Sequence, residues 1–129
     1  VQLEKGATAT PFENRLYGTE LVACQRYYEK CYSTSTVPGT ATADGSATII
    51  FGTATTGTIG LGVTFAVEKR AAPSIVNYDT AGASGACNRG GNGKSVSTDS
   101  ITTRNFRTYT GDSTSTNQAQ FLWTASAEL

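Results

Sequence analysis

The chain has 129 residues, in which ten Lys and Arg residues balance ten Asp and Glu residues. A chain of this length fits one domain with its own core, because domains commonly run from about 100 to about 200 residues. The zero net charge supplies no basic field for phosphates or anionic lipids, so we expect neither nucleic-acid binding nor membrane insertion. Histidine is absent, which removes the commonest general base and metal ligand, so we expect no catalytic residues, no metal and no cofactor.

The first segment, residues 1–16, is extended and turn-like in its sequence pattern, with Gly6 and Pro11 among its breakers. Its opening residues, Val-Gln-Leu-Glu, are typical of a strand already under way. The segment is therefore predicted to be the extended end of a preceding module. Residues 17–129 are predicted to form a single β-sandwich domain.

A helix is predicted over residues 19–32. Thr19, after Gly18, offers an N-cap, and Glu20 places a negative charge in the first turn, where it suits the helix dipole. A mostly apolar stripe then recurs at spacings of three and four residues, as expected for an amphipathic helix. The stripe consists of Leu21, Cys24, Gln25, Tyr28, Cys31 and Tyr32, while Arg26, Glu29 and Lys30 fall off it toward water.

The chain has three cysteines, Cys24, Cys31 and Cys87. Because this number is odd, at least one thiol stays unpaired within the chain whichever two form a disulfide. In a helix, Cys24 and Cys31 would lie about 10.5 Å apart along the axis, beyond the Cα separation of about 7 Å that a disulfide tolerates. Buried or idle thiols are the simplest interpretation, because free cysteine is among the most buried residue types. The alternative is an inter-subunit disulfide through one of the three.

Everything after the helix has the pattern of short strands. Residues 58–67 alternate Ile, Leu, Val and Phe with Thr, Gly and Ala, which is typical of a half-buried strand whose outer face carries small residues. Trp123 shares one face of a later strand with Phe121 and is expected in the core. The other predicted strands cover residues 47–53, 74–78, 102–110 and 118–127. The predicted fold class is mainly β, an antiparallel, jelly-roll-like β-sandwich with one amphipathic N-terminal helix.

Two polar stretches, residues 80–94 and 110–117, are predicted as loops that carry function, because long loops in compact domains tend to be functional. Tyr109 lies beside the second loop on the polar face of its strand and suits a contact surface. The candidate ligand-binding residues in and beside these loops are Asn88, Arg89, Asn92, Tyr109 and Asp112. An ordinary solvated loop is the alternative for the glycine-rich stretch.

Residues 88–95, Asn-Arg-Gly-Gly-Asn-Gly-Lys-Ser, come close to a phosphate-binding loop. Such a loop uses a leading glycine, four further residues and then Gly-Lys-Ser, so that backbone amides cradle phosphate and the lysine reaches its outer oxygens. Asn88 stands where the first glycine is needed, and no helical stripe follows to supply a helix N-terminus. The match is therefore interpreted as a coincidence. Cys87 lacks a histidine base, so thiol catalysis is not expected either.

A series of short strings spans the chain: QLEKG at residues 2–6, TPFE at 10–13, ELVACQRYY at 20–28, FAVEKRAAP at 65–73 and SAEL at 126–129. Together they resemble the C-terminal region of bacteriophage tail-fibre and related virion appendage proteins. Val22 and Ala23 stand where this family usually has Ala-Leu. Cys31 and Cys87 are extra cysteines, which favour covalent cross-linking.

The resemblance implies a virion structural protein, often a homotrimer, displayed at the virion surface with other virion proteins. Host attachment is the first expected function, through binding of a bacterial surface glycan or protein. The alternative is a structural head-fibre, collar or decoration protein that assembles on the virion and binds no host ligand. Polysaccharide depolymerisation would need a pair of carboxylates in a groove and ranks last.

Overall fold

The computed structural model describes residues 16–128, apart from the side chains of residues 51–56 and 112–115. In this part of the chain one helix, α1 (Tyr17–Gln25), precedes seven strands. The strands are β1 (Tyr28–Lys30), β2 (Ala47–Thr64), β3 (Ser74–Tyr78), β4 (Ala86–Arg89), β5 (Asn92–Ser95), β6 (Ser97–Asp99) and β7 (Asn105–Ser126). The predicted mainly β, antiparallel sandwich-like fold with one helix is confirmed. The predicted extended segment 1–16 lies outside the described residues, except for Leu16.

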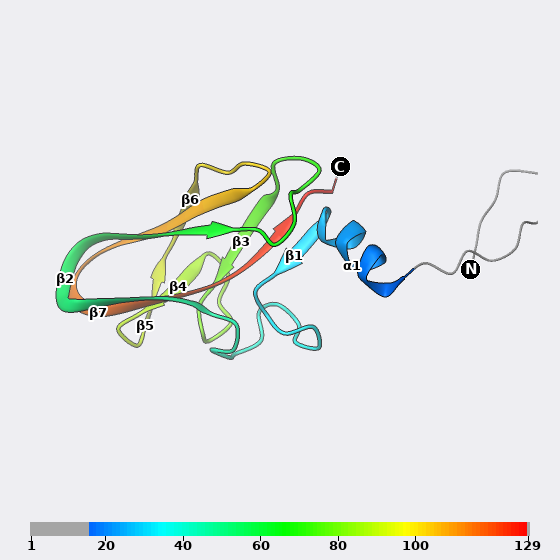
Figure 1. The fold of residues 1–129 in the computed structure, drawn as a ribbon. Coiled ribbons are helices and arrows are strands. Elements are labelled where there is room, and N and C mark those ends of the chain that lie inside the picture. The colour runs from blue at the N-terminus through cyan, green and yellow to red at the C-terminus, as the bar shows by residue number, and fades with distance from the viewer. Residues whose placement is uncertain (1–15, 129) are drawn as a thin grey trace, which may run out of the picture.

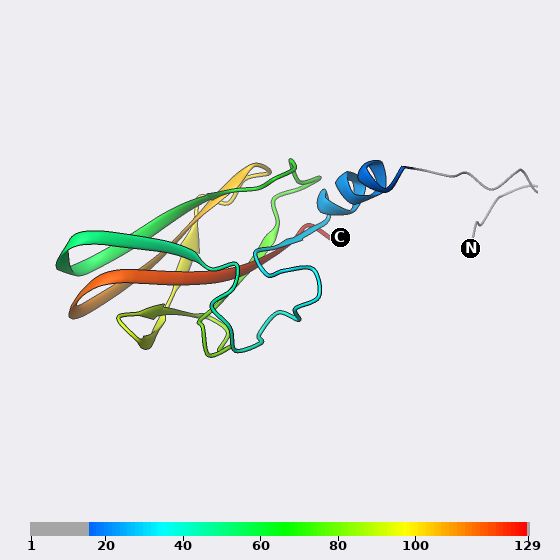
Figure 2. The same cartoon turned by 60° about the horizontal axis from the view of Figure 1, so that its bottom comes forward.

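The sandwich is built from one long antiparallel ribbon, in which β2 pairs with β7. The register runs from Ala47 opposite Phe121 to Thr64 opposite Asn105, with shifts near its middle. Figures 1 and 2 show the ribbon turning back on itself at the end of the molecule farthest from α1, so that the two halves of β7 lie in two layers. The prediction of a loop over residues 110–117 is therefore wrong, because this stretch is part of β7 at the bend.

The remaining strands flank the two halves of β7. Its C-terminal half lies between β1 and β3 near the end of the chain, and between β2 and β4 farther back. Its N-terminal half lies between β2 and β6, while β5 pairs with β4 as a hairpin. β7 is thus the central strand of both layers, and it brings together segments that are far apart in the sequence.

The core lies between the two layers and draws aromatic side chains from both. Phe106, from the N-terminal half of β7, contacts Trp123, from the C-terminal half, with ring centroids 5.4 Å apart. Phe65, directly after β2, lies 5.5 Å from Phe106 and 5.9 Å from Trp123. A second cluster consists of Ile59, Cys87, Ala119 and Phe121. The predicted core position of Trp123 is confirmed, because its residue surface is only 6% exposed.

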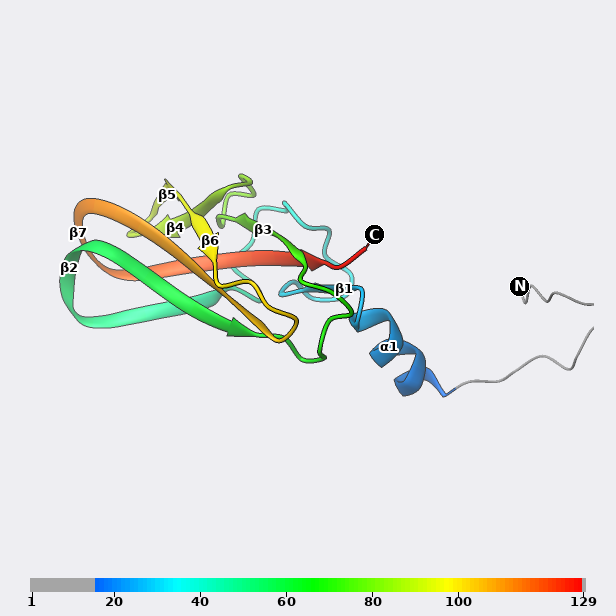
Figure 3. The ribbon, with the colours of Figure 1, turned by 90° about the horizontal axis from the view of Figure 1, so that it is seen from above.

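The helix is shorter than the predicted range of 19–32, because α1 ends at Gln25. None of its residues is buried, and Leu21 remains 41% exposed, so the part of the predicted apolar stripe that lies in α1 does not pack on the sandwich. Figure 3 shows α1 extending away from the strands. Residues 28–30 form β1 and pair with β7 instead. Most helical stability in proteins comes from tertiary packing. The residues after Gln25 gain this packing as a strand of the sheet, so they do not continue the helix.

Lys69 connects the end of α1 to the sandwich. Its Nζ donates hydrogen bonds to the Gln25 carbonyl and to Glu29 Oε2, both at 2.5 Å, and lies 4.8 Å from the centroid of the Phe65 ring. Glu29 Oε1 also accepts a hydrogen bond from the Ala66 N–H at 3.1 Å. The ammonium thus satisfies a carbonyl at the helix C-terminus, where cations are favoured. The prediction that Glu29 faces water is wrong, because β1 turns this side chain toward the buried lysine.

The glycine-rich stretch 80–94, predicted as a loop, contains β4 and most of β5, joined by Gly90 and Gly91. Both glycines have positive φ, 60° and 85°, as a two-residue hairpin turn of type I′ requires at its two central positions. Residues 88–95 therefore form a hairpin, without the helix N-terminus that a phosphate-binding loop uses.

The connection between β1 and β2 covers the outer face of the layer that contains the C-terminal half of β7. Tyr32 from this connection is buried and contacts Tyr78 of β3 edge to face, with ring centroids 6.1 Å apart. The Gly39 N–H donates a hydrogen bond to the Tyr32 hydroxyl at 3.3 Å. Leu122 of β7, which lies opposite Tyr78 in the register, is fully buried. The outer face of the opposite layer carries exposed residues of β2 and β7 and forms the open side of the sandwich.

Candidate functional site

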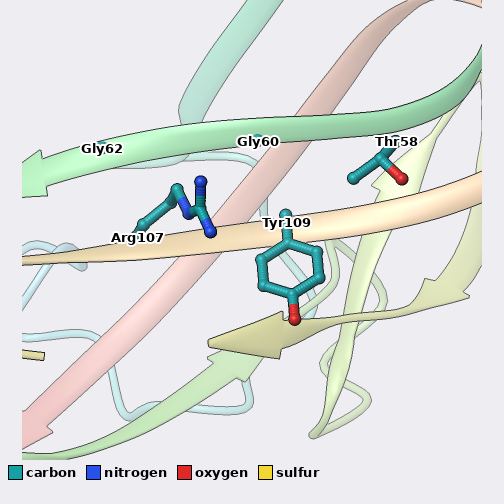
Figure 4. A pocket seen from close by; sticks show the side chains of 5 residues that line it. All are labelled: Thr58, Gly60, Gly62, Arg107 and Tyr109. Carbon is teal, nitrogen blue, oxygen red and sulfur yellow. The ribbon is translucent and has the colours of Figure 1, made fainter. Parts of the chain in front are cut away.

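An open groove of about 520 Å³ lies on the outer face of β2 and β7, in the layer that also contains β6. Five residues line it: Thr58, Gly60 and Gly62 from β2, and Arg107 and Tyr109 from β7 (Figure 4). Alternate residues of a strand point to opposite faces, and the inward positions beside these residues, Ile59, Phe106 and Thr108, are buried. The strand alternation that builds the core therefore also builds the groove.

The strand register arranges the groove residues in cross-strand rows. Gly62 lies opposite Arg107, which in turn lies opposite Asp99 of β6. Gly60 lies opposite Tyr109. Each of the two large side chains of β7 therefore has a glycine as its neighbour on β2, and the space beside the guanidinium and the aromatic ring stays open.

The two glycines are not required by the backbone, because neither Gly60 nor Gly62 has a positive φ. A Cβ on Gly60 would lie 3.3 Å from Tyr109 Cβ, whereas a Cβ on Gly62 would meet no other atom within 4 Å. Glycine weakens a strand, and it often marks a place where a ligand or another backbone approaches closely. The pair therefore leaves the outer face of β2 without side chains beside Arg107 and Tyr109.

Arg107 and Asp99 form a two-point ion pair at the edge of the groove. Arg107 Nε donates to Asp99 Oδ1 at 2.8 Å, and Arg107 Nη2 donates to Asp99 Oδ2 at 2.5 Å. The hydrogen bonds from Arg107 lower the pKa of the Asp99 carboxyl below its ordinary value, and the same contact raises the pKa of the guanidinium. Both groups are thus charged at neutral pH, and each holds the other in a fixed orientation.

Tyr109 adds an aromatic surface to this pair. The guanidinium carbon of Arg107 lies 5.5 Å from the centroid of the Tyr109 ring, within the range of a cation–π contact. A guanidinium carries five N–H donors, of which Asp99 takes two. An apolar ring beside oriented donors and a carboxylate acceptor suits a ligand that combines a flat apolar face with hydroxyl groups.

Tyr109 is the one predicted ligand-binding residue that lines this groove. Asn88 and Asn92 lie on the β4–β5 hairpin, where Asn88 is partly buried and Asn92 is exposed. This hairpin pairs with the C-terminal half of β7, in the layer opposite to that of Tyr109. For Asp112 the structure describes the main chain alone, which lies opposite Gly57 in the ribbon.

Arg89, predicted to recognise a ligand from an exposed loop, is instead fully buried. Its Nε donates to Thr116 Oγ1 at 3.0 Å, and its Nη1 donates to the Gly57 carbonyl at 2.7 Å. Both partners lie where the register of the β2–β7 ribbon shifts. The prediction fails because the ribbon folds back over the hairpin. Arg89 therefore holds the bend of the ribbon and does not face a ligand.

The sequence prediction omitted most of the groove. The omitted residues are Thr58, Gly60, Gly62, Asp99 and Arg107. One signal was available, because the alternation over residues 58–67 places small residues on the outer face of a strand. The sequence does not show which strand lies beside that face, so it could not assign Arg107 to it.

The three cysteines differ in exposure. Cys24 on α1 is exposed, Cys31 is partly buried and Cys87 is fully buried in the core. Cys31 Sγ accepts a hydrogen bond from the Trp123 backbone N–H at 3.0 Å, and burial raises the pKa of the Cys31 thiol. Burial excludes Cys87 from an inter-subunit disulfide in this fold. Of the three, Cys24 is the thiol placed to reach a second chain.

We expect one thiol, Cys24, to react quickly with dithiobis-nitrobenzoate in the native protein. The thiolate is the reacting species, so partial burial and a raised pKa should slow Cys31, and Cys87 should react only after unfolding. The absorbance released by the reagent, followed first in native buffer and then in denaturant, separates the fast, the slow and the buried thiol. The Cys24→Ser variant should lose the fast phase. A fast phase that persists in this variant would contradict the burial of the other two thiols.

Three searches with known proteins give no match: no protein-family model, no curated protein and no solved structure matches the chain significantly. Within the described residues, no group of three or more acidic or cysteine side chains is arranged to hold a metal ion. No helix of residues 16–128 is long and apolar enough to span a membrane. The function must therefore be inferred from the chemistry of the groove and from the sequence strings.

Proposed function

We propose that this chain is a host-attachment domain of a bacteriophage tail fibre or related virion appendage, and that its groove binds a glycan of the bacterial surface. The strings ELVACQRYY at 20–28 and FAVEKRAAP at 65–73 support the family. The observation that carries the binding function is the arrangement of Tyr109, Arg107 and Asp99 beside two strand glycines. In this proposal the domain acts at the virion surface, within a homotrimer and in contact with other virion proteins.

A sugar ring matches the groove in shape and in chemistry. Its axial C–H groups form a flat apolar face that can stack on the Tyr109 ring, and aromatic side chains contribute much buried area at low entropy cost. Its hydroxyl groups can accept hydrogen bonds from Arg107 and donate them to Asp99, both already oriented by their ion pair. Because the donors are fixed before binding, less side-chain entropy is lost when the ligand arrives.

The structural alternative, an appendage protein that assembles and binds no host ligand, is favoured by α1. Leu16 and Tyr17 are 80% and 78% exposed, and Leu21 and Val22 are also exposed. A helix that buries none of its residues against its own domain gains little stability from packing, and a contiguous apolar surface commonly marks a contact with another chain. This surface supports assembly in either proposal, so a binding measurement must separate them.

We expect Tyr109→Ala to weaken binding to bacterial surface glycans about tenfold or more, which corresponds to about 1.4 kcal/mol. The variant removes the stacking surface and the cation–π partner of Arg107, while Tyr109→Phe keeps the ring and should bind nearly as well as the parent. Binding of the purified domain to an array of capsular and O-antigen fragments measures both effects.

Asn92→Ala is the matched control, because Asn92 is an exposed polar residue on the β4–β5 hairpin in the opposite layer. It should leave glycan binding unchanged. Loss of binding in Asn92→Ala with full binding in Tyr109→Ala would move the site to the hairpin. A parent domain that binds no glycan on the array and does not adsorb to bacteria would favour the structural alternative.

A further inference from the structure

The groove continues past Arg107 into a second hollow of about 270 Å³. The two hollows share Gly62 and Arg107. Pockets that hold small ligands run from about 300 Å³ to about 1,000 Å³, so the first hollow lies within this range and the second falls just below it. Each has room for one small ring, and Gly62 lies at the passage between them.

The second hollow has a mixed lining, in which Val63 and Phe106 contribute apolar surface beside polar groups. Its lining includes Thr64, Ser100 and Asn105, which all carry groups that bond to hydroxyls. The Thr102 hydroxyl hydrogen-bonds Asn105 Oδ1 at 2.6 Å and thereby orients the amide. Ser100 has a φ of 52°, a conformation uncommon outside glycine that recurs at ligand-binding positions. Both hollows thus combine apolar surface with polar groups, and the hydrogen-bonding groups of the second differ from those that Arg107 and Tyr109 present in the first.

The charge balance of the groove favours a neutral ligand. Among the residues that the structure describes, Arg107 is the one cationic side chain that lines either hollow, and Asp99 binds it at two points. An acidic sugar would have to displace Asp99 from the guanidinium or accept a carboxylate as its neighbour, and like charges in contact are unfavourable. A neutral sugar can use the remaining donors of Arg107 without breaking the ion pair.

We infer that the groove takes a neutral oligosaccharide of at least two sugar residues, with one ring on Tyr109, the next beside Ser100 and Asn105, and the chain passing over Gly62. This inference rests on the proposed glycan-binding function and specifies its ligand. Gly62 is then the residue that sets ligand length, because it lines both hollows and a Cβ added at this position would meet no other atom within 4 Å.

The test is Gly62→Leu, measured against neutral oligosaccharides of one, two and more residues and against uronic-acid-containing chains of the same lengths. The parent should bind neutral chains of two or more residues about tenfold more tightly than single sugars and than the acidic chains. Gly62→Leu should lose this tenfold advantage of length, because the leucine side chain would stand in the passage between the two hollows. The melting temperature should not fall, because glycine is unfavourable in a strand.

Thr48→Leu is the control, because Thr48 is an exposed residue of the same strand outside the groove. It should bind as the parent does. A parent that binds single sugars as well as longer chains, that prefers the acidic chains, or that keeps its length preference in Gly62→Leu would overturn the inference and leave glycan binding in place. A parent that binds no saccharide would overturn the proposed function and the inference together.

Discussion

Replacing Lys69 with methionine is expected to lower the free energy of unfolding by about 3–5 kcal/mol. The Lys69 side chain is fully buried and that of Glu29 is only 13% exposed, so the variant leaves a carboxylate in the interior without its counter-charge. The Gln25 carbonyl at the end of α1 loses its donor at the same time. Domains commonly have a total stability of about 5–15 kcal/mol, so this one change removes a large part of it. Urea denaturation followed by Trp123 fluorescence measures the loss.

Two variants show whether burial is the cause. Arg104→Ala breaks the ion pair of Arg104 with Glu68, in which the two side chains are 75% and 53% exposed, and should change the free energy of unfolding little, because water screens exposed ion pairs. The double variant Lys69→Met with Glu29→Gln should be more stable than Lys69→Met alone, because it removes the buried charge and still offers Ala66 an acceptor. A Lys69→Met variant that unfolds at the same urea concentration as the parent would mean that water reaches the Lys69–Glu29 ion pair.

The alternation of apolar and small or polar residues predicts which strand residues point into the core, because this orientation depends only on residues that are close in the sequence. The alternation over residues 58–67 gave the inward positions of Ile59 and Phe65, and the strand over residues 74–78 was predicted with its full length. Trp123 likewise lies in the core, on the strand face that it was predicted to share with Phe121. When apolar side chains alternate with small or polar ones, a strand of any sheet with one buried face places the apolar ones in the core, and every β-sandwich has such faces.

The parts that failed depend on contacts between distant segments. The residues from Leu21 to Tyr32 do have helical spacing, but residues 28–30 pair with the edge of β7 instead. The Lys69 ammonium donates a hydrogen bond to the Gln25 carbonyl, at the point where the helix ends. Residues 110–117 have the Gly, Asp, Ser and Thr composition of a loop, yet they continue β7 around the bend of the ribbon. Such a composition is typical of a loop, but it says nothing about whether the segment pairs with another strand.

The groove was missed for a related reason. Function was expected in loops, because loops on a rigid scaffold commonly carry it, and this favoured Asn88, Arg89 and Asn92. The groove instead lies on a sheet face, where the register brings Gly62 beside Arg107. The sequence marks both strands as alternating but does not give their register, so the neighbours of Tyr109 could not be named from it.

The same register links the groove to the core, and Phe106→Ala tests that link. We expect this variant to lose about 3–5 kcal/mol of stability, as large-to-small changes of buried aromatic residues do, because Phe106 contacts both Phe65 and Trp123 between the layers. Phe106→Leu keeps most of the volume and should lose less. Thermal unfolding monitored by circular dichroism measures both.

Phe106 and Arg107 point to opposite faces of one strand, so the core contact that holds Phe106 also holds the groove layer in place. If the two layers share one core, Phe106→Ala should lose two signals at the same urea concentration. These are saccharide binding in the groove and the native fluorescence signal of Trp123 in the other layer. Cooperative loss of this kind is expected of a small domain that unfolds in one step. Loss of binding well before the loss of Trp123 fluorescence would show that the layer of β2, β6 and the N-terminal half of β7 opens independently, and that the bend held by Arg89 acts as a hinge.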